Sequence, residues 1–289
     1  MSAIAVIGCG AMGSRIAGRL LSTGHEVVVW NRTPAKTQPL VDLGATPAQS
    51  PAEAATRADA VITMVSGPQA LRAVTEGPEG IVAGVPSAAT MIEMSTVGPA
   101  AVSRLASVLP QGVGLLDAPV LGSVAEAESS ALTIFVGGPA ALVARWTPVL
   151  SALGSPVHVG PLGTGAAAKL VANSSLFGVL GVLGEVVTLA DGLGLSREAA
   201  FEVLSTTPLA AQAQRRRRAI ETGEYPARFA LSLARKDADL IVGAAADANI
   251  ALRLAPAAHA WLADAEAAGW GARDYTAMLA YILAARVRE

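Results

Sequence analysis

The sequence predicts an α/β fold in which a doubly wound, mainly parallel sheet is followed by an all-α domain, with a long helix joining the two. Short apolar runs alternate with helical patterns up to about residue 162, as is typical of a parallel sheet covered by helices on both faces. Every later segment has a helical pattern, and 289 residues exceed the length of a usual single domain. We therefore expect a sheet domain over residues 1–162 and a helical domain over 163–289, with the interdomain helix at about 165–192.

The first strand ends in a glycine pattern with a mechanical role. The apolar run at residues 3–7 leads into Gly-Cys-Gly-Ala-Met-Gly at residues 8–13, directly before a helical pattern. Gly8 permits a tight turn, Gly10 lets a pyrophosphate approach the backbone, and Gly13 lets the helix lie close on the sheet. This context predicts a Rossmann-type dinucleotide site at the helix N-terminus, with a plain glycine-rich turn as the alternative. The expected cofactor contacts here are Gly8, Gly10, Ala11, Met12 and Gly13.

The residues after the second strand, residues 26–30, indicate which dinucleotide is bound. An NAD-preferring domain has a carboxylate near this point, whereas this chain has Asn31, Arg32 and Thr33. The Arg32 guanidinium can grip a 2′-phosphate and the Thr33 hydroxyl can donate to it, with Lys36 close by in sequence. The pattern favours NADP over NAD; the alternative is that Arg32 is a solvated turn residue.

The remaining elements of the first half follow in alternation. They are helices at about 34–43, 51–56, 98–109 and 139–153, and strands at 60–64, 90–94, 114–117, 132–136 and 156–159. In such sheets ligands bind beyond the carboxyl ends of the strands. We therefore expect Met64, Val65 and Thr96 to contact the cofactor and Ser95 to contact the substrate. Ser95 and Thr96 could equally cap the next helix, and the two roles are compatible. Asp117, at another strand end, is expected to cap a turn before Pro119.

The second half predicts only helices. After the interdomain helix they begin near residues 196, 208, 231, 255 and 274, and the active site is expected between the domains. The apolar stretch 176–190 contains Glu185 and follows a polar Asn-Ser-Ser, so a buried helix is expected rather than a membrane span. Because the chain opens on a strand rather than on a signal-like segment, we expect a cytoplasmic protein.

Composition excludes several classes of function. A net charge of −2 and a pI near 6.0 give no electrostatic reason to expect nucleic acid, and the basic run Arg215–Arg218 is expected to be a solvated helix face or a subunit contact. Cys9 is the sole cysteine, so no intrachain disulfide forms. The three histidines lie far apart in sequence, and no metal site is expected.

Lysine usage singles out one further residue. Of the 21 basic residues 18 are arginines, and lysine occurs only at Lys36, Lys169 and Lys236. An ammonium can give up its proton when buried, which a guanidinium essentially cannot. Lys169 has apolar neighbours near the start of the interdomain helix and lies four residues before Asn173, on the same helix face. These two are the candidate catalytic residues, with a solvated surface lysine as the alternative.

Together these features resemble the β-hydroxyacid dehydrogenase family, which includes 3-hydroxyisobutyrate dehydrogenase, tartronate semialdehyde reductase and the glyoxylate/succinic semialdehyde reductases. The resemblance covers almost the whole chain. It rests on the glycine pattern and on four further motifs, which are Met-Ser-Thr-Val at 94–97, Asp-Ala-Pro-Val-Leu-Gly-Ser at 117–123, residues 165–173, and Lys236-Asp237.

The resemblance implies roles for several residues. Lys169 matches the catalytic lysine and Asn173 its helical companion, while Thr96 matches a residue near the nicotinamide. Lys236 matches a residue that reaches the cofactor, and Phe229 is similar to the aromatic residue that precedes this lysine. The family also implies a homodimer or homotetramer built through the helical domain.

One segment departs from the family pattern. Well-known members have Ser-Gly-Gly after Asp-Ala-Pro-Val, whereas this chain has Leu121, Gly122 and Ser123. Leu121 removes a hydroxyl donor and adds an apolar wall, which allows a bulkier or more apolar carbonyl substrate than the usual small, polar hydroxyacid; Ser123 and the Gly122 N–H can still bind one carboxylate oxygen. These residues, with Ser95, Lys169 and Asn173, are the expected substrate contacts.

The expected function is therefore hydride transfer between NADPH and a small aldehyde or oxo-acid carbonyl, with Lys169 as general acid and base. The alternative is an NADPH-dependent imine reductase, because residues 29–36 resemble the opening of those enzymes. A lysine ammonium would repel an iminium substrate, which favours a carbonyl. A non-catalytic NADP-binding module is a further alternative, and the retained lysine argues against it.

Overall fold

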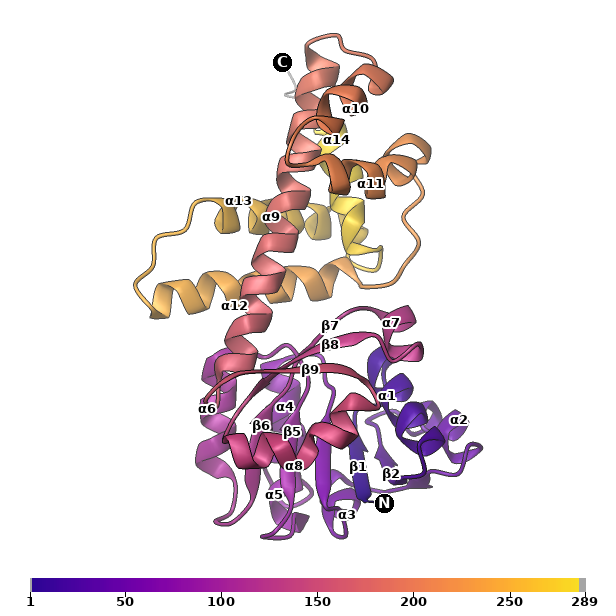
Figure 1. Cartoon of the computed structure of the whole chain (residues 1–289), viewed down its shortest axis with the longest axis vertical. Coiled ribbons are helices and arrows are strands. Elements are labelled where there is room, and N and C mark those ends of the chain that lie inside the picture. The colour runs from indigo at the N-terminus through magenta and orange to yellow at the C-terminus, as the bar shows by residue number, and fades with distance from the viewer. Residues whose placement is uncertain (1, 286–289) are drawn as a thin grey trace. The chain divides into compact units, whose positions relative to one another are not determined.

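The protein divides into two units, Met1–Leu170 and Val171–Glu289, in a computed structural model that describes residues 2–285. The first unit is built on a mostly parallel sheet and the second is helical, and the long helix α9, Thr164–Gly192, runs from one into the other (Figure 1). The expected fold class is confirmed.

The sheet of the first unit has the strand order β3-β2-β1-β4-β5-β6-β8-β7, with β9 paired to β8. Strands β1 to β6 pair in parallel where they are neighbours, whereas β8 runs antiparallel to β6 and β7. The sequence did not predict the short strands β3 and β7 or the antiparallel direction of β8. The strands are β1 Ala3–Ile7, β2 Glu26–Trp30, β3 Thr46–Pro47, β4 Ala60–Thr63, β5 Thr90–Glu93, β6 Gly114–Asp117, β7 Val120–Leu121, β8 Leu132–Gly137 and β9 Gly154–Gly160.

Two apolar cores lie on the two faces of this sheet. Successive β1 residues alternate between them, so Val6 packs with α1 and α8 while Ile7 packs with α3 to α6. Both faces are therefore covered, as the continuous apolar strands require. The helices of this unit are α1 Ala11–Ser22, α2 Gln38–Val41, α3 Pro51–Ala55, α4 Pro68–Thr75, α5 Ile81–Gly84, α6 Gly98–Val108, α7 Val124–Glu128 and α8 Ala140–Ser151.

The single helix expected over residues 34–43 is wrong in detail. The chain forms a 3₁₀ turn, Pro34–Lys36, followed by the separate short helix α2. Pro39 explains the break, because proline has no N–H for the helical ladder and its ring conflicts with the carbonyl four residues earlier. Proline is accepted within the first turn of a new helix, which is where α2 has it.

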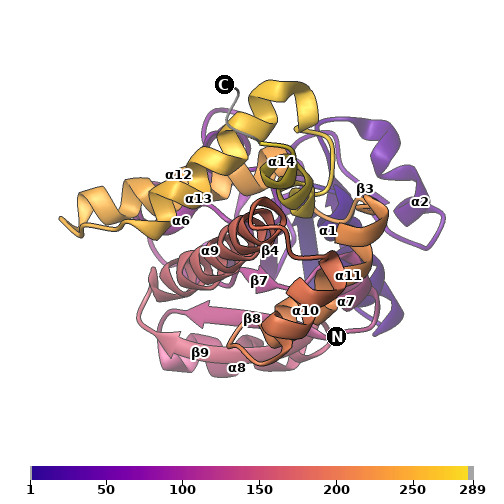
Figure 2. The same cartoon turned by 90° about the horizontal axis from the view of Figure 1, so that it is seen from above.

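Helices α10 to α14 are grouped around α9 in the second unit, with a π-helical turn at Glu266–Trp270 and a 3₁₀ turn at Tyr275–Ala277 (Figure 2). They begin close to the expected positions. Their bounds are α10 Arg197–Ser205, α11 Ala210–Thr222, α12 Leu231–Asp247, α13 Leu254–Ala265 and α14 Met278–Ala284. Within residues 2–285, α9 alone is long and apolar enough by composition to cross a membrane, and 44% of its most apolar window is buried inside the protein.

Candidate active site

The glycine loop has the geometry that a dinucleotide needs. Gly8 adopts a φ of +101°, and a Cβ there would lie 2.3 Å from the Met64 carbonyl oxygen. A Cβ on Gly13 would lie 1.8 Å from the Gly8 oxygen, so α1 packs on the loop through a bare backbone. A Cβ on Gly10 would instead meet no atom within 4 Å, at the residue that precedes the first turn of α1. This open approach to the N-terminal N–H groups of α1 fits a pyrophosphate.

The loop after β2 presents cationic side chains and braces the glycine loop. Arg32, Thr33 and Lys36 are exposed. Asn31, in contrast, uses its side chain internally: its Oδ1 accepts from the Cys9 N–H at 3.0 Å and its Nδ2 donates to the Thr33 carbonyl at 2.9 Å. Asn31 therefore ties the two loops together.

Cys9 lies inside this arrangement. It is 3% exposed, its thiol donates to the Trp30 carbonyl at 3.6 Å, and burial raises its pKa to about 11. The sulfur therefore remains a thiol at neutral pH and contributes packing rather than nucleophilic chemistry.

The carboxyl ends of β4 and β5 are joined by a buried polar network. The Val65 N–H donates to Ser95 Oγ at 2.8 Å, and the Ser95 N–H donates to Glu93 Oε1 at 2.6 Å. The Thr63 hydroxyl donates to the other Glu93 oxygen. The residue that directly precedes α6 is Val97, and the Ser95 hydroxyl is engaged with the Val65 N–H, so Ser95 does not cap this helix.

Glu93 is a residue that the sequence analysis did not single out. It is 1% exposed, and burial raises its pKa to about 7 against the lowering effect of its hydrogen bonds from Ser95 and Thr63. Asp117, its neighbour in register on β6, adds to the rise. The sequence signal that could have identified Glu93 is an acidic residue at the end of an apolar strand, one position before the Met-Ser-Thr-Val motif.

Asp117 was expected to cap a local turn before Pro119. In the structure it caps the start of the long helix α9 instead. Its Oδ1 accepts from the Gly163 N–H at 2.8 Å and its Oδ2 accepts from the Ala166 N–H at 2.6 Å, at the start of α9. A carboxylate at a helix N-terminus satisfies unpaired N–H groups and complements the helix dipole. Burial raises the pKa of Asp117, and these backbone bonds oppose the rise. The helix that carries Lys169 is thereby fixed to the end of β6.

The segment that departs from the family pattern forms β7 and the turn after it. Leu121 is 37% exposed on β7, and Gly122 has a φ of +138°. The Ser123 hydroxyl donates to Glu126 Oε2 at 2.5 Å and its N–H donates to the same oxygen at 2.7 Å. The hydroxyl and the N–H of Ser123 are thus both bonded to Glu126 at the start of α7, so this segment has few hydrogen-bond donors left for a substrate.

On α9 the two candidate catalytic residues are both buried. Lys169 is 9% exposed and Asn173 is 2% exposed. The Asn173 Nδ2 donates to Asp237 Oδ2 at 2.8 Å, and the other Asp237 oxygen lies 2.5 Å from the Lys236 Nζ. Asp237, 2% exposed, fixes the orientation of the Asn173 amide. In the sequence it stood out only as part of the Lys236-Asp237 motif.

Phe229 precedes α12 in the second unit. Its N–H donates to Asp274 Oδ2 at 3.1 Å, and its ring lies 5.5 Å from that of Tyr275. The residues expected to contact the cofactor in the first unit, by comparison, follow the carboxyl ends of β1, β2, β4 and β5.

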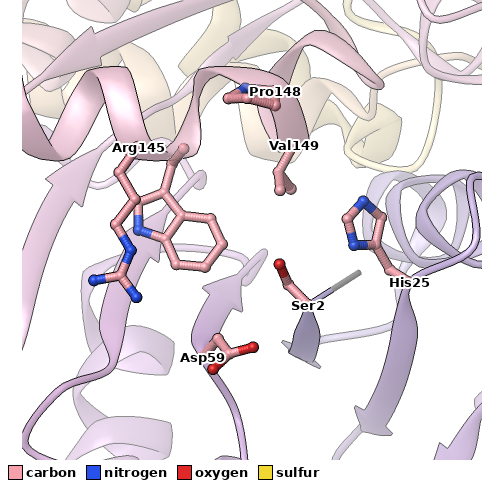
Figure 3. Close-up of a pocket in the computed structure, with 7 residues that line it drawn as sticks. Ser2, His25, Asp59, Arg145, Pro148 and Val149 are labelled. Carbon is pink, nitrogen blue, oxygen red and sulfur yellow. The ribbon is translucent and has the colours of Figure 1, made fainter.

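A pocket at the opposite end of the strands, away from these loops, is not part of the candidate site. Ser2, His25 and Asp59 line it and directly precede β1, β2 and β4, so they lie at the amino ends of these strands (Figure 3). Residues 2–285 contain no group of histidine, cysteine and carboxylate side chains that could hold a metal.

Comparison with known proteins agrees with this geometry. Residues 3–162 match the NAD-binding domain of 6-phosphogluconate dehydrogenase, and residues 163–282 match the NAD-binding domain of NADP-dependent 3-hydroxyisobutyrate dehydrogenase. The chain is 33% identical to the 3-sulfolactaldehyde reductase of Escherichia coli over 283 residues, which cover 96% of this chain and 95% of that protein.

Solved structures give the same result. The structure of Mycobacterium tuberculosis 3-hydroxyisobutyrate dehydrogenase with L-serine superposes with a TM-score of 0.88, at 27% identity, covering 98% of this chain and 100% of that one. An imine reductase from Myxococcus stipitatus in complex with NADP+ shares the fold, with a TM-score of 0.62 and 21% identity, covering 97% of this chain and 99% of that one. The chain belongs to the β-hydroxyacid dehydrogenase family and is an NAD(P)-dependent oxidoreductase of the 3-hydroxyacid dehydrogenase type.

Proposed function

We propose that this protein is an NADPH-dependent reductase of small aldehydes or oxo acids in which Lys169 is the proton donor. The observation that carries the proposal is the placement of Lys169: it is buried on α9, one turn before an asparagine whose amide is fixed by Asp237. A lysine so held can act on the oxygen of a bound substrate with little reorganisation.

In the proposed reaction, different residues handle the proton, the substrate oxygen, the cofactor and the rest of the substrate. NADPH supplies a hydride when it is bound. Lys169 stabilises the negative charge that develops on the substrate oxygen and then donates its proton to that oxygen; in the reverse direction it accepts the proton. Asn173 positions the same oxygen. The glycine loop and Arg32, with Thr33 and Lys36, would hold the phosphates, and Ser95 with residues 121–123 would line the substrate.

We also propose a cytoplasmic location and a homodimer or homotetramer formed through the helical domain. Lysine chemistry favours a carbonyl over an iminium as substrate, because a charged ammonium repels a cationic carbon–nitrogen double bond. Imine turnover is accordingly an outcome of the test rather than a second proposal.

The test of the catalytic role is Lys169→Ala, with Lys169→Arg as a matched variant that keeps the charge. We expect turnover of an aldehyde by Lys169→Ala to fall by roughly a hundredfold or more, with the NADPH dissociation constant nearly unchanged. Lys169→Arg should also remain slow, because a guanidinium does not release its proton. Near-normal turnover by Lys169→Ala, or reduction of cyclic imines alone by the unmodified enzyme, would contradict the proposal.

The cofactor preference is tested at Arg32. Arg32→Ala should weaken NADPH binding by about tenfold or more and leave NADH binding unchanged, because only NADPH has the 2′-phosphate that the guanidinium would hold. Fluorescence titration with both nucleotides measures this. Equal losses for the two nucleotides would show that Arg32 does not select between them.

A further inference from the structure

The four consecutive arginines of α11 are not equivalent. Arg215 and Arg218 are exposed. Arg217 pairs with Glu221 at 2.7 Å and lies over the Phe201 ring at 5.0 Å. Arg216 has a different environment: its Nη2 donates to the Tyr275 hydroxyl at 3.1 Å, and its guanidinium carbon lies 6.0 Å from the centre of that ring. One arginine of the run therefore faces the interior of the second unit.

The charge of Arg216 has no counter-ion in the described part of the chain. None of the ion pairs within residues 2–285 includes it. Its Nε is buried and makes no hydrogen bond with those residues, and the same holds for Gln212 Oε1, one turn earlier on α11. A half-buried guanidinium with an unused donor is costly to keep unless an anion completes it.

The surroundings of Arg216 lead toward the candidate catalytic residues. The Tyr275 ring packs edge-on against Phe177 at 6.2 Å and lies 5.5 Å from Phe229. Phe177 is four residues after Asn173 on α9, so the two share one helix face. The contacts that begin on the Asn173 face of α9 therefore run through Phe177 and Tyr275 to Arg216.

We propose that Arg216 binds the carboxylate of the substrate, and that the substrate is an aldehyde or oxo acid whose carboxylate lies several bonds from its reactive carbonyl. This inference rests on the proposed function. Planar carboxylates suit the fork of an arginine, and the Tyr275 hydroxyl and the unused Nε–H point to a shared anion site. A remote carboxylate site also accounts for Leu121 and for the commitment of Ser123 to Glu126, which leave residues 121–123 poor in donors.

The test compares 4-oxobutanoate with its uncharged methyl ester as substrates. The variants are Arg216→Gln, the charge-retaining Arg216→Lys, and Arg218→Gln as a control that removes an equal charge from an exposed position of the same helix. We expect Arg216→Gln to lower kcat/KM for the acid by roughly 10- to 100-fold while the ester changes by less than about threefold. Arg216→Lys should fall between, and Arg218→Gln should match the unmodified enzyme.

A binding measurement makes the result independent of turnover and of the folding of the variant. In the unmodified protein with NADPH, calorimetry should show butanedioate binding at least about tenfold more tightly than butanediamide. Equal affinities, or equal losses for acid and ester in Arg216→Gln, would overturn the assignment of Arg216. Absence of turnover with both aldehydes, while butanedioate binds tightly to the unmodified protein and at least about tenfold more weakly to Arg216→Gln, would instead overturn the proposed function.

Discussion

Glu93 should make the stability of this protein depend on pH near neutrality. Burial raises its pKa to about 7, above an ordinary value of 4.5. The folded state therefore holds this proton more tightly than the unfolded chain, so the contribution is fully present below about pH 4.5 and is lost as the pH rises through about 7. The difference between the two pKa values corresponds to roughly 3 kcal/mol of unfolding free energy.

The perturbation that isolates this effect is Glu93→Gln. A glutamine is neutral at every pH, can accept from the Ser95 N–H as Glu93 does, and can donate to a rotated Thr63 hydroxyl. Urea unfolding at about pH 5 and about pH 8 should show the variant gaining roughly 2.5 kcal/mol relative to the unmodified protein, the part of the full difference that falls within this interval.

Glu202→Gln, which changes an exposed carboxylate on α10, serves as the control and should show no such gain. If the difference between Glu93→Gln and the unmodified protein is the same at both pH values, Glu93 is not held protonated by its burial. The reasoning about the β4–β5 network would then be refuted.

Three further predictions concern the glycine loop and the start of α9. Gly10→Ala should leave Tm within about 2 °C but weaken NADPH binding by about tenfold or more, since its methyl group enters the open space before α1; thermal unfolding and fluorescence titration measure the two effects. Gly13→Ala should lower Tm by several degrees, because its Cβ would lie 1.8 Å from the Gly8 oxygen, and an unchanged Tm would show that the loop yields freely. Asp117→Asn should lower the unfolding free energy by roughly 1–3 kcal/mol, since an amide replaces a carboxylate at two helix N–H groups. Asp264→Asn, at an exposed position, is its control, and equal urea midpoints for the two variants would contradict the capping role.

The parts of the fold that follow from local patterns could be predicted from the sequence. The β1 strand, the glycine loop and α1 are contiguous, so their spacing carries the whole motif. The helices of the second unit were likewise visible from their periodicity. The antiparallel placement of β8 was not, because pairing partners and directions depend on contacts between distant segments.

The buried polar groups of the site were the harder part. The bond from Ser95 to Glu93 is local, but Glu93 meets Thr63, thirty positions away in the sequence, only because β4 and β5 align in register. The sequence suggested a local turn for Asp117, whereas its partners lie at the start of α9, 46 and 49 residues away. Such side-chain contacts depend on how distant segments pack together, so the local periodicity of the sequence does not predict them.

The enclosed sulfur of the nucleotide-binding loop gives the protein a natural reporter. Because Cys9 is the sole cysteine, every alkylation event on the chain counts openings of one loop. With the thiol protonated and shielded, a maleimide or iodoacetamide reagent reacts only when that loop detaches from the strand beneath it. The rate of labelling therefore measures the local opening of the loop on the intact, unmutated enzyme, and a nucleotide that closes the loop should slow it.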